Sequence, residues 1–304
     1  MAETTDNRPL DDIVQPFQID ASRLRGRMVR LGGALDEILT KHAYPQAVAQ
    51  LLGETITLAV ALAGMLKYEG IFTLQTKGDG PIRLMVADVT STGDLRGYAQ
   101  FDDSRLPETA GRPVPDLLGK GYLAFTVDQG EHTERYQGIV ELTGDTLTDS
   151  VQHYFRQSEQ LDTGIRVSVE RRGAGWRGGA LMLQRLPGED KAIVDPGSGV
   201  EDDWRRAMVL MSTASGDEMT DPELGANDLL YRLFHEDGVR VWPPHALRQA
   251  CRCSRERVAT VLVSLPREEV ETLKVDGRIS ATCEFCNSTY AFDEAELASL
   301  LARN

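Results

Sequence analysis

The stretch that decides how this chain is organised is CRCSRERVATVLVSLPREEVETLKVDGRISATCEFC, residues 251–286. It contains all four cysteines of the chain: Cys251 and Cys253 form a Cys-x-Cys pair, and Cys283 and Cys286 form a Cys-x-x-Cys pair. A structural zinc ion takes four ligands in a tetrahedron, and two close pairs of thiolates supply that arrangement. The spacing therefore predicts one Zn²⁺ ion per chain, bound by four sulfur atoms. Disulfide bonds, an iron–sulfur cluster and free thiols are the alternatives that it leaves open.

The residues around the cysteines predict a small C-terminal domain, residues 246–304. Between the two pairs, the apolar pattern predicts helices at residues 255–265 and 268–274, followed by a strand that enters Cys283. A segment of roughly 60 residues is too short to bury a large core, so a bound metal would supply much of its stability.

Composition and charge exclude several classes of protein. The 304 residues include 33 basic and 47 acidic side chains, a net charge of −14, and this length predicts about two domains. Such an acidic chain repels the phosphate backbone, which argues against nucleic acid as a partner. The first ten residues lack the features of a secretion signal, and the weakly polar run 55–66 is shorter than the ~20 residues of a membrane-spanning helix. We therefore expect a cytoplasmic protein that has no membrane partner.

Residues 1–188 predict an α+β domain with a mainly antiparallel sheet. Helices are expected at residues 33–42, 45–67 and 147–159, and the second has a wide apolar face that should be buried. Strands that follow one another, with helices set apart from them, favour antiparallel pairing. The expected strands are residues 17–19, 27–31, 71–76, 82–89, 95–101, 122–128, 137–142, 164–171 and 179–186.

Residues 189–245 form an acidic helical linker. From Glu189 to Gly238 there are 13 acidic and 4 basic residues, a net charge of 4 − 13 = −9. Apolar residues at helical spacing predict two amphipathic helices, near residues 204–211 and 229–234. Repulsion between like charges should weaken their packing, so we expect a metastable segment. An ordinary acidic helical pair is the plainer interpretation of the same pattern.

The surroundings of the first cysteine pair favour reactive thiols. A disulfide within a Cys-x-Cys pair would be strained and easily reduced again. Positive charge nearby favours thiolates, which are the nucleophilic form of cysteine. Four arginines flank this pair: Arg248, Arg252, Arg255 and Arg257. A purely structural zinc site, without redox function, is the competing interpretation.

Motifs spread over most of the chain resemble one known family. They are CRCSRER at residues 251–257, CEFCN at 283–287, YRLFHE at 231–236, YFRQSEQ at 154–160, and the turn around residues 78–80. Together they resemble the redox-regulated chaperone of the 33-kDa heat-shock protein family. The cysteine motif is the most specific of them.

This resemblance implies a holdase chaperone and not an enzyme. In the reduced state, Cys251, Cys253, Cys283 and Cys286 would bind zinc and the protein would be idle. Hypochlorite, or peroxide with heat, would form the disulfides Cys251–Cys253 and Cys283–Cys286, zinc would leave, and the linker would unfold. The exposed apolar surface would then bind unfolding client proteins without ATP, usually as a homodimer.

The sequence gives less support to two other functions. A thiol–disulfide oxidoreductase would need a thioredoxin-like βαβ context around Cys283, and the pattern shows none. A zinc-ribbon module that binds nucleic acid is opposed by the acidic charge of the whole chain. His245 is the histidine nearest the cysteines, but four thiolates already complete a zinc site. The glycine-rich residues 173–179 predict a hairpin turn rather than a phosphate-binding loop, because no helix pattern follows them.

Overall fold

The computed structural model describes residues 11–22, 24–106, 111–130, 135–173, 175–185 and 200–301. The chain divides into two compact units, Met1–Gln249 and Ala250–Asn304. The first eleven residues of the expected linker, 189–199, lie outside the described residues.

The first sheet of the larger unit is antiparallel and joins strands from both ends of that unit. Phe17 pairs with Gly26, and the Phe17 ring occupies the space that a side chain at Gly26 would fill, since an added Cβ would lie 2.1 Å from it. In spatial order the strands are β10 (Val239–Val241), β1 (Ile13–Ile19), β2 (Leu24–Leu31), β9 (Gly175–Arg185) and β8 (Thr163–Arg172); β11 (His245–Ala246) also pairs with β1.

The second sheet of this unit has one face on the core. Buried and more exposed residues alternate along its strands, as expected for a sheet covered on one side. All its described pairs are antiparallel except that of β12 with β5, which is parallel. The spatial order is β12 (Arg248–Gln249), β5 (Asp94–Phe101), β4 (Ile82–Thr90), β3 (Ile71–Gly78), β6 (Gly121–Asp128) and β7 (Tyr136–Glu141).

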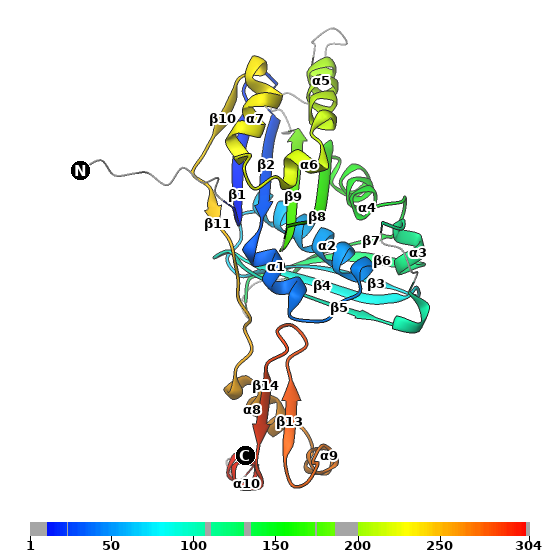
Figure 1. Cartoon of the computed structure of the whole chain (residues 1–304), viewed down its shortest axis with the longest axis vertical. Helices are drawn as coiled ribbons and strands as arrows, with labels where there is room; N and C mark the ends of the chain where they lie inside the picture. The colour runs from blue at the N-terminus through cyan, green and yellow to red at the C-terminus, as the bar shows by residue number, and fades with distance from the viewer. Residues whose placement is uncertain are drawn as a thin grey trace, which may run out of the picture. The chain divides into compact units, whose positions relative to one another are not determined.

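The main core lies around the helix α2 (Gln46–Met65), which packs against strands of both sheets (Figure 1). α2 is long and apolar enough to cross a membrane by length and composition, but 78% of its most apolar window is buried. Its hydropathy is therefore explained by its place in the core. The other helices of this part are α1 (Gly33–Thr40), η1 (Asp103–Arg105), α3 (Val114–Leu118), α4 (Leu147–Tyr154) and η2 (Phe155–Glu159), a π-helical turn.

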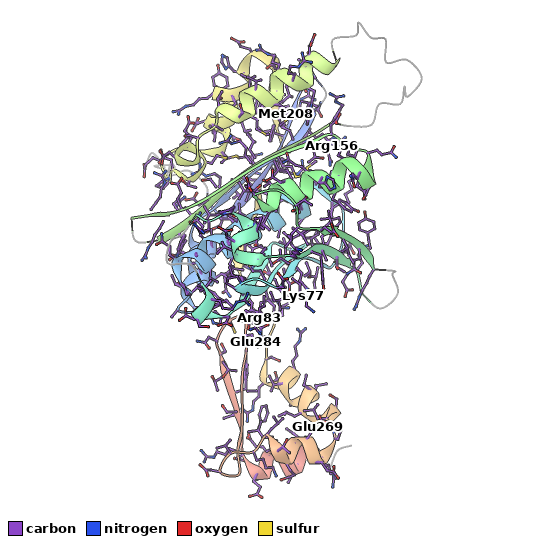
Figure 2. The ribbon with its side chains drawn as sticks, turned by 90° about the vertical axis from the view of Figure 1, so that its right-hand side faces the viewer. Lys77, Arg83, Arg156, Met208, Glu269 and Glu284 are labelled. Atoms are coloured by element: carbon purple, nitrogen blue, oxygen red, sulfur yellow. The ribbon has the colours of Figure 1, made fainter. Side chains whose placement is uncertain are left out.

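A second core lies on the other face of the first sheet, under the described part of the linker. The linker helices are α5 (Val200–Thr213), α6 (Gly216–Thr220) and α7 (Ala226–Phe234), with η3 (His235–Asp237) after them. In Figure 2, α5, which carries Met208, lies on one side of the β8–β9 ribbon and α4 lies on the other. Glycines let these helices approach closely: a Cβ at Gly164 would lie 2.4 Å from the Met208 sulfur, and one at Gly179 would lie 2.3 Å from the Met219 carbonyl oxygen.

The smaller unit is a β-hairpin with three helices. Its elements are α8 (Arg255–Ser264), α9 (Arg267–Thr272), β13 (Ile279–Thr282), β14 (Thr289–Phe292) and α10 (Glu294–Leu301). Its core is small and consists of Leu262, Val270, Ile279, Phe292 and Leu297.

The predicted fold class, an α+β chain with mainly antiparallel sheets, helices and a C-terminal four-cysteine region, is confirmed. The predicted helix over residues 147–159 is α-helical only to Tyr154 and continues as the π-turn η2. The sequence pattern missed the short strands β10, β11, β12 and β14, and also α3, α6 and α10. The division into three parts at residues 188 and 245 stays a prediction. So does the expectation that the linker unfolds separately from the domain that precedes it.

Candidate metal centre

The four cysteine sulfurs meet at one point of the smaller unit. Their Sγ atoms all lie within 4.8 Å of one another, and the four cysteines form no disulfide. Two short approaches join one residue of each pair: Cys251 Sγ lies 3.7 Å from Cys283 Sγ, and Cys253 Sγ lies 3.3 Å from Cys286 Sγ. The spacing argument therefore named four residues that the fold brings together.

Two local structures position the pairs. Cys251 and Cys253 precede α8, whose N-cap Ser254 accepts a hydrogen bond from the Arg257 backbone N–H. Cys283 and Cys286 lie in the turn between β13 and β14, where Asn287 N–H donates to the Cys283 carbonyl at 2.8 Å and Cys283 N–H donates to the Ser288 carbonyl at 2.9 Å. Figure 2 shows Glu284 at the tip of this hairpin, away from Glu269 on α9.

This geometry fits a tetrahedral thiolate site. A zinc ion with Zn–S bonds of about 2.3 Å holds its sulfurs ~3.8 Å apart, close to the separations between these thiols. All four donors are soft sulfur atoms that are partly exposed, a set that suits Zn²⁺ or an iron–sulfur centre. The structure supports a metal site here, and the donor atoms do not by themselves name the metal.

The thiols differ in electrostatic environment when no metal is bound. Burial raises the pKa of Cys253 to about 12, and burial likewise raises the pKa of Cys283. Burial also acts to raise the pKa of Cys286, but hydrogen bonds with Ser288 and with neighbouring thiols outweigh it and lower that pKa to about 6. Cys286 is therefore the thiol that ionises most easily of these three.

The expectation that flanking arginines favour thiolates at the first pair is wrong for Cys253. Arg248 pairs with Asp94 at 2.6 Å, and Arg255 pairs with Glu296 at 2.7 Å while its guanidinium lies over the Phe292 ring. Burial has the largest effect on the pKa of Cys253, and the other groups that shift it are Tyr290 and the neighbouring thiols.

Two further residues of the site were missed from the sequence. The Tyr290 hydroxyl lies 3.2 Å from Cys253 Sγ, and Ser288 Oγ lies 3.3 Å from Cys286 Sγ. Contact with Cys253 and burial raise the pKa of Tyr290 to about 12, so its hydroxyl stays protonated and can donate to sulfur. Their position in the hairpin after Cys286 is the signal that could have identified them.

The weaker candidates do not join this site. His245 lies on β11, in the larger unit, and is absent from the described four-cysteine cluster. Of the glycine-rich residues 173–179, Gly173, at φ +57°, lies in the predicted turn between β8 and β9, whereas Gly175 to Gly179 already belong to β9.

Comparisons with known proteins decide the family. The family model described as "Hsp33 protein" matches residues 12–293. A relative from Caulobacter vibrioides named "33 kDa chaperonin" is 41% identical over 297 residues, which cover 95% of this chain and 97% of the relative. This chain belongs to the Hsp33 family. A second Hsp33 relative, the 33 kDa chaperonin of Pseudomonas fluorescens strain SBW25, is 38% identical and covers 97% of this chain and 95% of its own length.

A solved Hsp33 structure confirms the fold. The crystal structure of the 33 kDa chaperonin from Thermotoga maritima superposes with a TM-score of 0.80 at 24% identity, over 97% of this chain and 99% of that one. At this identity the likeness concerns the fold alone. The names of the Hsp33 relatives support a chaperone role for this chain.

Proposed function

We propose that this chain is a redox-regulated holdase of the cytoplasm, which binds unfolding proteins without ATP after its cysteines are oxidised. The observation that carries the proposal is the meeting of four thiols in a unit whose apolar core is small. A unit of this kind depends on the bonds between its sulfurs and a metal. Chemistry that consumes the thiolates therefore removes much of its stability.

Cys251, Cys253, Cys283 and Cys286 would hold one Zn²⁺ in the reduced protein. When bound, the ion would keep all four side chains as thiolates and would crosslink the start of α8 to the β13–β14 hairpin. Ser288 and Tyr290 would orient Cys286 and Cys253 through their hydroxyl contacts.

Oxidation would convert each pair of thiolates to a disulfide. The two thiolates give up two electrons and form one S–S bond, while hypochlorous acid takes up these electrons and is reduced to chloride and hydroxide. The pairing Cys251–Cys253 and Cys283–Cys286 is taken from the resemblance to the family. Each disulfide removes two metal ligands, so the smaller unit would lose its metal and unfold.

The linker is the part that would pass this change to the client surface. Its helices α5–α7 cover an apolar face of the first sheet that includes Phe17, Met28 and Leu183, and Phe234 of α7 stacks on Phe17 with ring centroids 6.0 Å apart. The chain then runs through β10, β11 and β12 and reaches Cys251 two residues after β12 ends. Unfolding of the linker would expose this apolar face to clients, and the exposed face would favour a homodimer.

The experiment measures zinc content and chaperone activity on the same samples. Reduced protein should contain one zinc per chain and barely suppress aggregation of a heat-unfolded client. Protein treated with hypochlorite should lose the zinc and suppress aggregation at near-stoichiometric amounts without ATP. Peptide mapping should find the two disulfides named above, and mass measurement should find a dimer.

A quadruple Cys→Ser variant is the matched control, because it cannot respond to oxidant at this site. If wild-type protein suppresses aggregation equally before and after oxidation, the cysteines form a purely structural metal site and the proposed redox regulation is refuted. Rapid catalytic reduction of insulin by the reduced protein would instead support a thiol–disulfide oxidoreductase.

A further inference from the structure

An aromatic pocket of about 410 Å³ lies in the larger unit, beside the C-terminal end of α2. Its walls include the rings of Phe72, Phe125, Tyr136, Tyr154 and Phe155. The rings contact one another: Phe125 meets Tyr154 edge to face with centroids 4.7 Å apart, and Tyr136 lies 6.2 Å from Phe125. Faces of aromatic rings attract cations, most strongly where water is partly excluded.

A carboxylate also lines this pocket. Glu159 Oε1 accepts hydrogen bonds from the hydroxyls of Tyr136, at 2.5 Å, and Tyr154, at 2.7 Å. Burial raises the pKa of both tyrosines, so both hydroxyls stay protonated and can donate to an ionised acceptor. Among the described residues, nothing donates to the second oxygen, Oε2, or forms an ion pair with it. The pocket therefore combines aromatic walls with a negative charge that can bind one more group.

The backbone turns Glu159 into this position. After α4 the chain widens into the π-turn η2 and ends in Gln160, whose φ of +55° is left-handed. Arg156, Gln157 and Ser158 are exposed, whereas Glu159 is half-buried against the tyrosines. This turn belongs to the YFRQSEQ motif of residues 154–160, which the four-cysteine switch does not use.

We propose that this pocket binds a basic side chain, arginine or lysine, of an extended polypeptide. An organic cation with an aliphatic stem can pack against the aromatic rings and form an ion pair with the Glu159 carboxylate. The choice of a polypeptide over a free amine rests on the proposed chaperone function and on the sheet edge beside the pocket. Tyr136 begins β7, which pairs with β6 alone among the described strands, so an extended chain can add to its open edge.

The charges around the pocket favour this occupant. The whole chain carries a net charge of −14, which attracts basic segments. The opposing charge is Lys67, an exposed residue of the pocket lining that forms no ion pair with Glu159. Its ammonium group should weaken the binding of a cation without preventing it.

The test uses the reduced full-length chain and two dansyl-labelled heptapeptides of glycine and serine. One has a central arginine and the other has norleucine at that position. Fluorescence anisotropy should show at least ten-fold tighter binding of the arginine peptide. Glu159→Gln should remove this preference, and Lys67→Met should strengthen it. The control Glu37→Gln, an exposed carboxylate of α1 outside the pocket lining, should leave the preference unchanged.

Equal binding of the two peptides to the unaltered chain would overturn the proposal, even where a variant fails to fold. An arginine preference that survives in folded Glu159→Gln protein would also overturn it. Free agmatine that competes as strongly as the arginine peptide would refute the polypeptide part of the proposal. Because all measurements are made on reduced protein, they do not depend on whether the redox switch exists.

Discussion

At the scale of single residues, the four cysteines are one kind of side chain in different environments. Ser288 lowers the pKa of Cys286, whereas burial raises the pKa of Cys253 although it lies only 3.3 Å away. A thiol reacts as its thiolate, so these environments should set an order of reaction. That order should be visible after the metal is removed and before the smaller unit unfolds, because these environments exist only in the folded unit.

We predict that iodoacetamide modifies Cys286 before Cys253 in reduced protein immediately after a chelator removes the metal, while the smaller unit is still folded. The pKa of Cys286 is about 6, so its thiolate fraction and labelling rate should rise as the pH increases through 6 and level off above 7. Cys253, with a pKa of about 12, should stay slow over the same range. Peptide mapping by mass spectrometry measures both rates. Ser288→Ala should slow Cys286 at pH 6, and equal rates for both cysteines would contradict the assignment.

The sequence was sufficient to name the four sulfurs but not their surroundings. Two close pairs of cysteines can place four sulfurs at one point whatever lies between them. By contrast, the neutralisation of Arg255 depends on Glu296, which is 41 residues further along the chain and gives no local signal. Arg248 and Arg255 looked free in the sequence because only the fold brings their carboxylate partners, Asp94 and Glu296, to them.

At the scale of elements, the short helix α6 is held by two arginines of the first sheet. Arg30 on β2 is 1% exposed, and its guanidinium donates to the carbonyls of Glu218 and Asp221. Arg177 on β9 donates to the Thr220 carbonyl at 2.9 Å and also pairs with Asp11, which lies 3.6 Å from Arg30. These contacts place cations at the negative end of α6.

Arg30→Met should therefore loosen the linker in the reduced protein. The substitution leaves two part-buried carbonyls without these donors, at a cost of up to about 1–3 kcal/mol for each group. We expect less hydrogen-exchange protection in α6 and α7, together with partial suppression of client aggregation before any oxidation. Arg83→Met, which removes an exposed pair with Asp102, is the matched control. Unchanged protection in Arg30→Met protein would show that these contacts do not hold the linker.

Elements with a strong hydrophobic periodicity could be predicted from the sequence. Elements that depend on contacts with residues far away in the sequence could not. The helix expected at residues 45–67 is α2, because a 20-residue apolar segment has few other ways to be buried. The linker helices near residues 204–211 and 229–234 are parts of α5 and α7. The acidic charge of the linker, however, is partly balanced by arginines, such as Arg172 beside Asp217 and Arg206 beside Glu236. β10 and β12 have only three and two residues, too few for any periodicity.

At the scale of the whole molecule, two separate apolar cores should respond differently to oxidation. The core around α2 lies between the sheets, whereas the core under α5–α7 is covered by an acidic linker that leads toward Cys251. Structural zinc contributes on the order of 10–16 kcal/mol to the folding free energy of small zinc domains. This is more than the free energy of unfolding of a marginally stable neighbouring segment.

Hydrogen exchange on reduced and oxidised protein tests this difference. Protection at residues 204–211 and 229–234 should fall on oxidation, while protection at residues 56–63 and 82–89 should persist. Urea-unfolded protein gives the lower limit for each peptide. A linker that stays equally protected after zinc release would mean that clients bind elsewhere on the larger unit.

The glycines beneath the linker have a consequence for mutational tolerance. A methyl group at Gly179 would collide with the Met219 backbone, which cannot turn aside as the end of a side chain can. Gly179→Ala should thus lift α6 from the sheet and give a reduced protein that binds apolar dyes and clients with its cysteines intact. A saturation-mutagenesis screen for dye binding should find it as a gain-of-function site. The addition of a single methyl group would then produce a chaperone that stays active under reducing conditions.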